Sequence, residues 1–169
     1  MPRTLYDAAG FVAGLWLATA LLLPLGARWA HAEDPGLALL ESRLHLAVND
    51  FRSAEHLIPL ERRSELDRVA RAHSEDMAHR GFFAHESPEG LNWVDRLSQA
   101  GVTGFRMAGE NVGQTNRAEP NREILEGWKH SPVHLENLVS RPMNATGIGI
   151  ARAPDGRLFY TQLYLNFPR

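Results

Sequence analysis

The chain changes its hydrophobic period part-way along, and this change limits the folds open to it. In the first part apolar residues recur at helical spacing, for example at positions 37, 40, 44, 47, 48 and 51. Near the end two β-rich runs, 147–151 and 158–165, flank the turn sequence Pro154-Asp155-Gly156, which predicts a β-hairpin. Helices first and strands last predict an α+β layer fold.

Turn and cap residues divide the helical part into five expected helices. Ser64 with Asp67 resembles a capping box, Gly81 and Gly101 suit helix C-termini, and prolines suit first turns. The expected helices span about 36–54, 64–80, 91–100, a stretch from Pro120, and 132–138. A third strand is expected either at 104–106 or around Val112.

The first 32 residues have the pattern of an export signal. Arg3 supplies a basic start, an apolar run covers 8–25, and Ala30-His31-Ala32 offers a cleavage site. We therefore expect a signal peptide at 1–32, one domain at 33–169, and a secreted or periplasmic protein with no stable membrane span after cleavage. The alternative is an uncleaved anchor, because the run is about as long as a short membrane span.

Composition excludes several classes of function. The chain has no cysteine, so it has no disulfides, no thiolate zinc site and no cysteine nucleophile. Its formal net charge is −2, whereas a nucleic-acid-binding protein needs a basic face to neutralise phosphates. We therefore expect no nucleic-acid partner, and a fold held together by its apolar core alone.

Three motif blocks follow one another in a characteristic order. They are H-x-S-P-x-G at 85–90, G-E-N at 109–111, and W-x-x-S-P-x-H-x-x-N-L at 128–138. Together they resemble the CAP superfamily of cysteine-rich secretory, venom-allergen and pathogenesis-related proteins, and most closely its cysteine-free bacterial SCP-like branch. The resemblance covers roughly residues 37–167. It implies a CAP-type α-β-α sandwich, with a small antiparallel sheet between helical layers.

The resemblance also implies a central cavity, which in the family is lined by two histidines and two glutamates. His85 and Glu110 match one of each kind. Ser131 stands in the place of the second glutamate, and Phe159 in the place of the second histidine. Members of the bacterial branch often have a histidine in S-P-x-H, so we expect His134 to turn toward the same cavity.

The residues themselves favour a site at the first two positions. His85 lies in a loop rich in turn formers, where its ring is free to face a cleft; alternatively it hydrogen-bonds the loop backbone. Glu110 lies among small and apolar neighbours, so its carboxylate needs a partner, a proton or a metal. The alternative for Glu110 is an ion pair with an arginine or a helix cap.

Two imidazoles and one carboxylate suffice for zinc with an open coordination position. His85, Glu110 and His134 are therefore the candidate ligands of a divalent cation such as zinc, although their sequence separations give no local ligand pattern. Ser131 and Trp128 complete the candidate binding set. His73 shares an apolar helical face and is interpreted as a buried structural histidine.

Two classes of function remain open. One is a secreted binding module for a small ligand, a lipid or a cell-envelope component, with or without a cation. The other is a hydrolase, in which Glu110 acts as a general base, or His85 and His134 hold a metal that activates water, or Ser131 serves as a nucleophile beside His134. We favour binding, because two of the family's four cavity residues are replaced and no complete catalytic set is visible.

Overall fold

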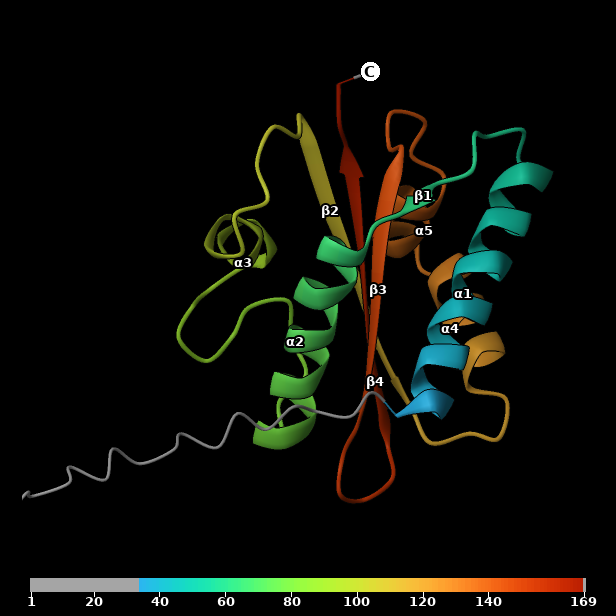
Figure 1. Cartoon of the computed structure of the whole chain (residues 1–169). Helices are drawn as coiled ribbons and strands as arrows, with labels where there is room; N and C mark the ends of the chain where they lie inside the picture. The colour runs from blue at the N-terminus through green and yellow to red at the C-terminus, as the bar shows by residue number, and fades with distance from the viewer. Residues whose placement is uncertain (1–33, 169) are drawn as a thin grey trace, which may run out of the picture. The chain divides into compact units, whose positions relative to one another are not determined.

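A computed structural model describes residues 34–168, so the expected signal peptide at 1–32 lies outside the described residues. Five helices and four strands follow one another in this part of the chain (Figure 1). Their bounds are α1 Pro35–Ala54, β1 Glu61–Arg62, α2 Ser64–Arg80, α3 Trp93–Gln99, β2 Met107–Thr115, α4 Pro120–Lys129, α5 Pro132–Leu138, β3 Ala145–Arg152 and β4 Leu158–Asn166. The helices expected from the sequence are all present.

The strands form one sheet in the order β1-β3-β4-β2. The expected hairpin of β3 and β4 is confirmed, and Gly156 takes a φ of 85° in its turn. The expected third strand is β2, which pairs antiparallel with β4 around Val112 and leaves residues 104–106 outside the sheet. The sheet is mixed, because the two residues of β1 pair parallel with the start of β3.

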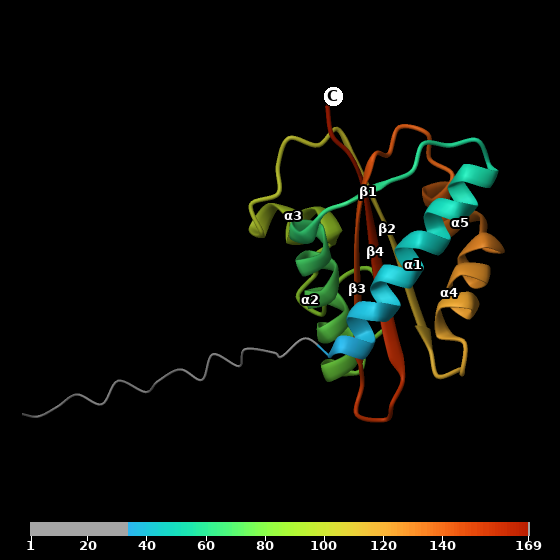
Figure 2. The same ribbon diagram turned by 45° about the vertical axis from the view of Figure 1, so that its right-hand side comes forward.

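Helices cover both faces of this sheet. In Figures 1 and 2, α2 and α3 lie on one face, and α1, α4 and α5 lie on the other. The helix α2 lies directly against the backbone of β3, where a Cβ added at Gly147 or Gly149 would overlap the backbone of Leu66 or Arg71. Glycine at these two strand positions therefore allows the close contact between helix and sheet.

One expected helix cap is wrong. Ser64 is already helical, Arg63 is the N-cap residue, and no side chain caps the start of α2. Asp67 instead accepts hydrogen bonds from Arg62 and from the backbone N–H of Ile148, so it joins the helix to β1 and β3. At the other end Gly81 has a φ of 70°, as expected for a left-handed C-terminal residue.

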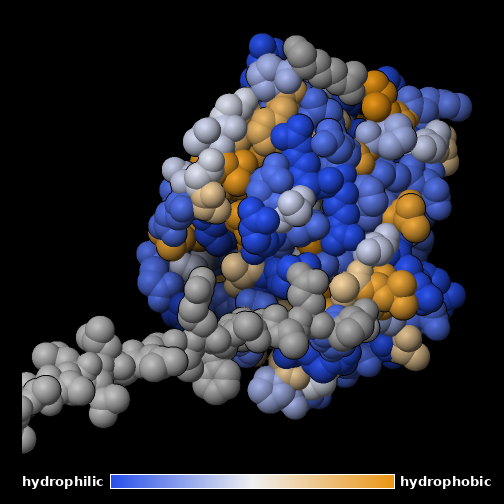
Figure 3. Space-filling model, in the orientation of Figure 1, coloured by the Kyte–Doolittle hydropathy of each residue, from blue (hydrophilic) through white to orange (hydrophobic). Residues whose placement is uncertain are grey.

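In the view of Figure 3 hydrophilic residues dominate, and the apolar patches are scattered. Among residues 34–168, no helix is both long and apolar enough to cross a membrane.

Candidate functional site

The strand β2 lies at an edge of the sheet and contains the G-E-N sequence. The side chain of Glu110 has no exposed area, and both of its carboxylate oxygens are bound. Oε2 lies 2.6 Å from Nη2 of Arg96, and Oε1 lies 2.8 Å from Nδ1 of His85. A buried carboxylate needs such partners to offset the loss of its hydration.

Arg96 was not among the site residues predicted from the sequence. It lies on α3, and its Nη1 also donates to the carbonyl oxygens of His85 (2.9 Å) and Leu91 (2.8 Å). One guanidinium therefore fixes the loop after α2 and the carboxylate on β2 at the same time. The sequence suggested an ion pair with an arginine as an alternative role for Glu110. Glu110 in fact makes this ion pair, with Arg96, and also contacts His85.

The other two residues of the motif position α5. Asn111 donates to the carbonyl oxygen of His134 (3.1 Å). Asn137 donates to the carbonyl oxygen of Glu110 (3.1 Å) and to Oδ1 of Asn111 (2.8 Å). A side chain at Gly109 would overlap the Asn137 amide, so glycine is required for this approach. The motif thus fixes α5, and with it His134, against the sheet edge.

His134 lies beside His85, with 6.4 Å between the ring centroids. Its Nδ1 lies 2.9 Å from Oγ of Ser131, one helical turn earlier. The structure therefore brings His85, Glu110, His134 and Ser131 into one neighbourhood, although they come from a loop, a strand and a helix. We call this group, together with Arg96, the histidine site.

Hydrogen bonding and burial determine which ring nitrogens of the two histidines can accept a hydrogen bond from a ligand. Neutral His85 donates its Nδ1 proton to the Glu110 carboxylate, so the lone pair of Nε2 is left for another partner. The side chain of His85 is 38% exposed, which makes this acceptor accessible. Burial lowers the pKa of His134 and favours its neutral form, and a proton on His85 would lower that pKa further.

The histidine site does not fit zinc as the sequence suggested. An imidazole nitrogen binds zinc at about 2.0–2.1 Å, so two rings on one tetrahedral zinc have centroids roughly 5 Å apart. The observed separation is larger, and the Glu110 oxygens already bind Arg96 and His85. Among the described residues, no three His, Asp or Glu side chains are arranged to hold a metal ion.

Trp128 and Phe159 occupy places outside the histidine site. Trp128 is 3% exposed, and its indole N–H donates to the carbonyl oxygen of Val112. Phe159 pairs opposite Gln114, four residues along β2 from Glu110, which corresponds to about 13 Å at the usual strand rise. Phe159 is buried, and it packs in an apolar cluster that includes Met77. The aromatic ring beside His85 is instead Trp93, at 5.8 Å between centroids.

Comparison with known proteins identifies relatives of this chain. The family model for the cysteine-rich secretory protein family, CAP, matches residues 45–164. The uncharacterized protein YkwD of Bacillus subtilis (strain 168) is 28% identical over 122 residues, which is 72% of this chain and 46% of that protein. The uncharacterized membrane protein YlbC of the same organism is 32% identical over 118 residues. The match covers 70% of this chain and 32% of that protein. This chain thus spans less than half the length of these curated relatives.

Solved structures share the fold. An extracellular protein containing an SCP domain from Bacillus anthracis has a TM-score of 0.66 and 30% identity, over 76% of this chain and 41% of that chain. An outer surface protein from Borrelia burgdorferi has a TM-score of 0.70 and 17% identity, over 77% of this chain and 94% of that chain. The second likeness is one of fold alone.

Proposed function

This chain belongs to the CAP family of cysteine-rich secretory proteins, and from that premise we propose that it is a secreted binding module. The histidine site is its binding site, and its ligand is a neutral, hydroxyl-rich molecule such as a glycan of the cell envelope. Similarity to an extracellular bacterial protein supports the location. The ligand class rests on the hydrogen-bonding state of His85.

The observation that supports this proposal most strongly is the 2.8 Å contact between His85 and buried Glu110. It makes Nε2 of His85 an acceptor that faces outward from a ring fixed in one orientation. A hydroxyl or an amide N–H is the natural partner for such an acceptor, whereas a carboxylate or phosphate offers only further acceptors.

Two neighbours extend this recognition surface. The second imidazole, His134, lies within reach of the same ligand. The half-buried ring of Trp93 lies edge-on to His85 and adds apolar area next to the polar acceptor. A sugar ring presents hydroxyls at its rim and C–H groups on its faces, and so matches this combination. An unbranched lipid lacks the hydroxyls.

Calorimetric titration with a soluble oligomer of N-acetylglucosamine tests the proposal. The protein should bind the oligomer, and the variant His85→Asn should bind it at least about tenfold more weakly, equivalent to about 1.4 kcal/mol. His79→Asn serves as a matched control, because His79 is exposed on α2 and has no role in the histidine site. Equal binding by His85→Asn and the unsubstituted protein would contradict the proposal.

A second candidate function is metal-free hydrolysis. A carboxylate-bound histidine is also the arrangement of a general base, and Ser131 lies 2.9 Å from a second histidine. Here His85 Nε2 would take a proton from a water that attacks a carbonyl carbon. His85 would then pass this proton to the leaving group, and His134 would orient that group by a hydrogen bond.

Turnover of an acylated chromogenic substrate distinguishes the two functions. Hydrolysis should be lost in both His85→Asn and His134→Asn, and should be unaffected by a metal chelator. Binding of the oligomer without turnover of any such substrate would favour the binding module.

A further inference from the structure

The outer side of α1 carries a row of exposed side chains, two of them leucines. Leu39 is 50% exposed and Leu46 is 62% exposed, and they lie about two helical turns apart. Arg43 and Asp50 are exposed on the same helix. Figure 2 shows α1 in front of the sheet, with no other described helix in front of it. We call these four residues the α1 stripe.

Helical geometry places the four side chains of the α1 stripe in one narrow sector. At about 100° per residue they fall within about 60° of one another around the helix axis. Leu44 and Val48, on the opposite side of the helix, are fully buried in the core. Single exposed leucines are common on protein surfaces. Here two of them line the same side of one helix, together with two opposite charges.

The two charges of the α1 stripe are not paired within the described part of the chain. Neither Arg43 nor Asp50 makes an ion pair or a side-chain hydrogen bond with any of residues 34–168. Seven residues, or about 10 Å of helix, separate them. By contrast Arg80, an exposed arginine at the end of α2, is paired with two carboxylates. An exposed cation and an exposed anion therefore lie on either side of Leu46, both available to another molecule.

This arrangement is complementary to itself. When two copies of α1 lie antiparallel about a two-fold axis between Leu46 and Ala47, Arg43 of each copy faces Asp50 of the other. Both charged side chains are offset to the same side of the leucines, so the two-fold rotation keeps them on the same side of the helix pair. The leucines then pack along the middle of the contact. A parallel, in-register pair would instead place like charges opposite each other.

We propose that the α1 stripe is the contact between two copies of this chain in a two-fold symmetric dimer. The contact uses one helix face from each copy, which is less than the roughly 800 Å² per partner of stable interfaces. The dimer is therefore weak, and its population depends on protein concentration. No residue of the histidine site lies on α1, so dimerisation leaves that site free in both copies.

Sedimentation equilibrium of the purified protein between about 10 and 500 µM tests the proposal. The unsubstituted protein should shift from monomer toward dimer over this range. Arg43→Asp should weaken the association at least about tenfold, because it places two carboxylates opposite each other at both ends of the contact. The double variant Arg43→Asp/Asp50→Arg restores opposite charges in reversed order, and it should associate within about threefold of the unsubstituted protein.

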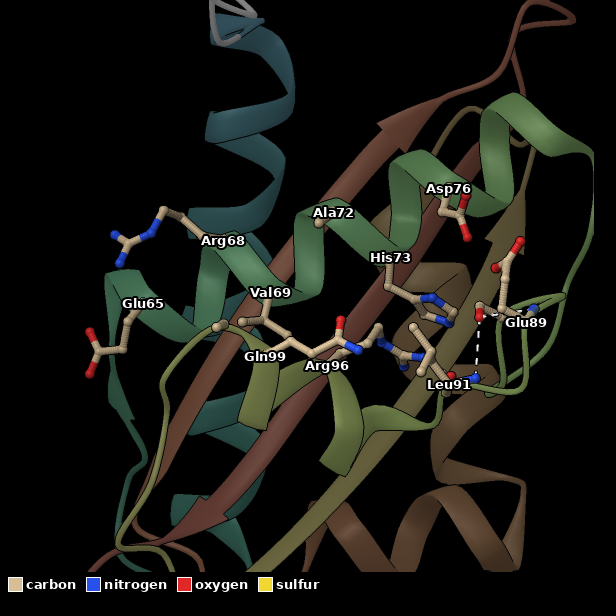
Figure 4. A pocket seen from close by; sticks show the side chains of 12 residues that line it. Glu65, Arg68, Val69, Ala72, His73, Asp76, Glu89, Leu91, Arg96 and Gln99 are labelled. Atoms are coloured by element: carbon tan, nitrogen blue, oxygen red, sulfur yellow. Dashed lines mark hydrogen bonds between the residues drawn. The ribbon is translucent and has the colours of Figure 1, made fainter.

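Arg68→Asp is the matched control, because it makes the same change at an exposed position of α2. Figure 4 shows Arg68 at the groove between α2 and α3, on a different helix from the α1 stripe. This variant should associate normally. Arg43→Asp should bind the sugar oligomer as the unsubstituted protein does, so a failure of the dimer is distinguishable from a failure of the proposed function.

Three results would overturn the dimer. The first is a monomer at every concentration, which would leave the α1 stripe for a different partner. The second is equal association by Arg43→Asp and the unsubstituted protein. The third is a double variant that associates as weakly as Arg43→Asp, because recovery by the exchanged charges is specific to the antiparallel contact.

Discussion

Two buried glutamates of this protein are held in different ways. Glu41, on α1, is 1% exposed and receives Arg62 at 3.0 Å, Arg71 at 2.7 Å and the backbone N–H of Ile150 at 3.1 Å. Glu110, on β2, has a fully buried side chain and receives Arg96 at 2.6 Å and His85 at 2.8 Å. The difference lies in the second partner: an arginine in one case and a histidine in the other.

The consequences of this difference are structural for Glu41 and chemical for Glu110. Arg62 and Arg71 remain charged at any ordinary pH, so the Glu41 network is a permanent connection between α1, β1, α2 and β3. The Glu110 network ends on a titratable ring that is 38% exposed. A buried carboxylate that binds a partly exposed histidine is the better candidate for function.

The largest expected effect on stability comes from Glu41. Glu41→Ala should lower the free energy of unfolding by about 3–5 kcal/mol, because it removes the buried carboxylate that two partly buried arginines and one backbone donor share. Urea denaturation measures this loss. Asp50→Ala, at an exposed position of the same helix, should change little, and binding at the histidine site should survive in both variants.

Glu110→Gln should affect stability less and function more. The amide keeps the size of the side chain but loses the charge that Arg96 and His85 meet, so we expect a loss of about 1–3 kcal/mol in stability. Binding of the N-acetylglucosamine oligomer should weaken by at least about tenfold. If Glu110→Gln bound the oligomer normally, the contrast between the two glutamates would have no functional meaning.

The third expected effect is the smallest and concerns His73. Burial lowers the pKa of His73 in the folded protein, so the unfolded chain binds more protons just below the ordinary value of about 6.5. The resulting stabilisation is complete above that value and is lost as the pH falls toward the lowered pKa.

His73→Gln keeps a donor for the Ala84 carbonyl and removes the titration. It should lower stability by about 1 kcal/mol at neutral pH and reduce the fall in Tm between about pH 7 and pH 5. The fall should not vanish, because burial also lowers the pKa values of His45 and His134. An unchanged pH profile in His73→Gln would contradict a buried neutral histidine.

Much of the fold could be predicted from local patterns. Prolines and glycines define element ends through backbone geometry alone, which is why α5 begins at Pro132 and α2 ends at Gly81. The strand β1 could not be predicted, because two residues show no period and their pairing depends on β3 being in place. The mistaken cap at Ser64 has a similar cause, since Asp67 bonds to residues distant in sequence.

The histidine site could be predicted in part. Motif order pointed to His85, Glu110 and His134, and the apolar neighbours of Glu110 implied a buried partner. Nothing in the sequence distinguished Arg96 from the other arginines, because its role depends on how α3 packs against β2. The place of Phe159 likewise depends on strand register, which sequence similarity to a family motif does not fix.

The most direct test of the central claim is the position of the proton on the neutral His85 ring, read from two-bond ¹H–¹⁵N correlations at about pH 8. The structure predicts that Nδ1 carries the proton, because it donates to Glu110, and that Nε2 is a bare acceptor. Addition of the N-acetylglucosamine oligomer should then shift the Nε2 resonance. A His85 ring with its proton on Nε2, or one unaffected by the oligomer, would contradict the account.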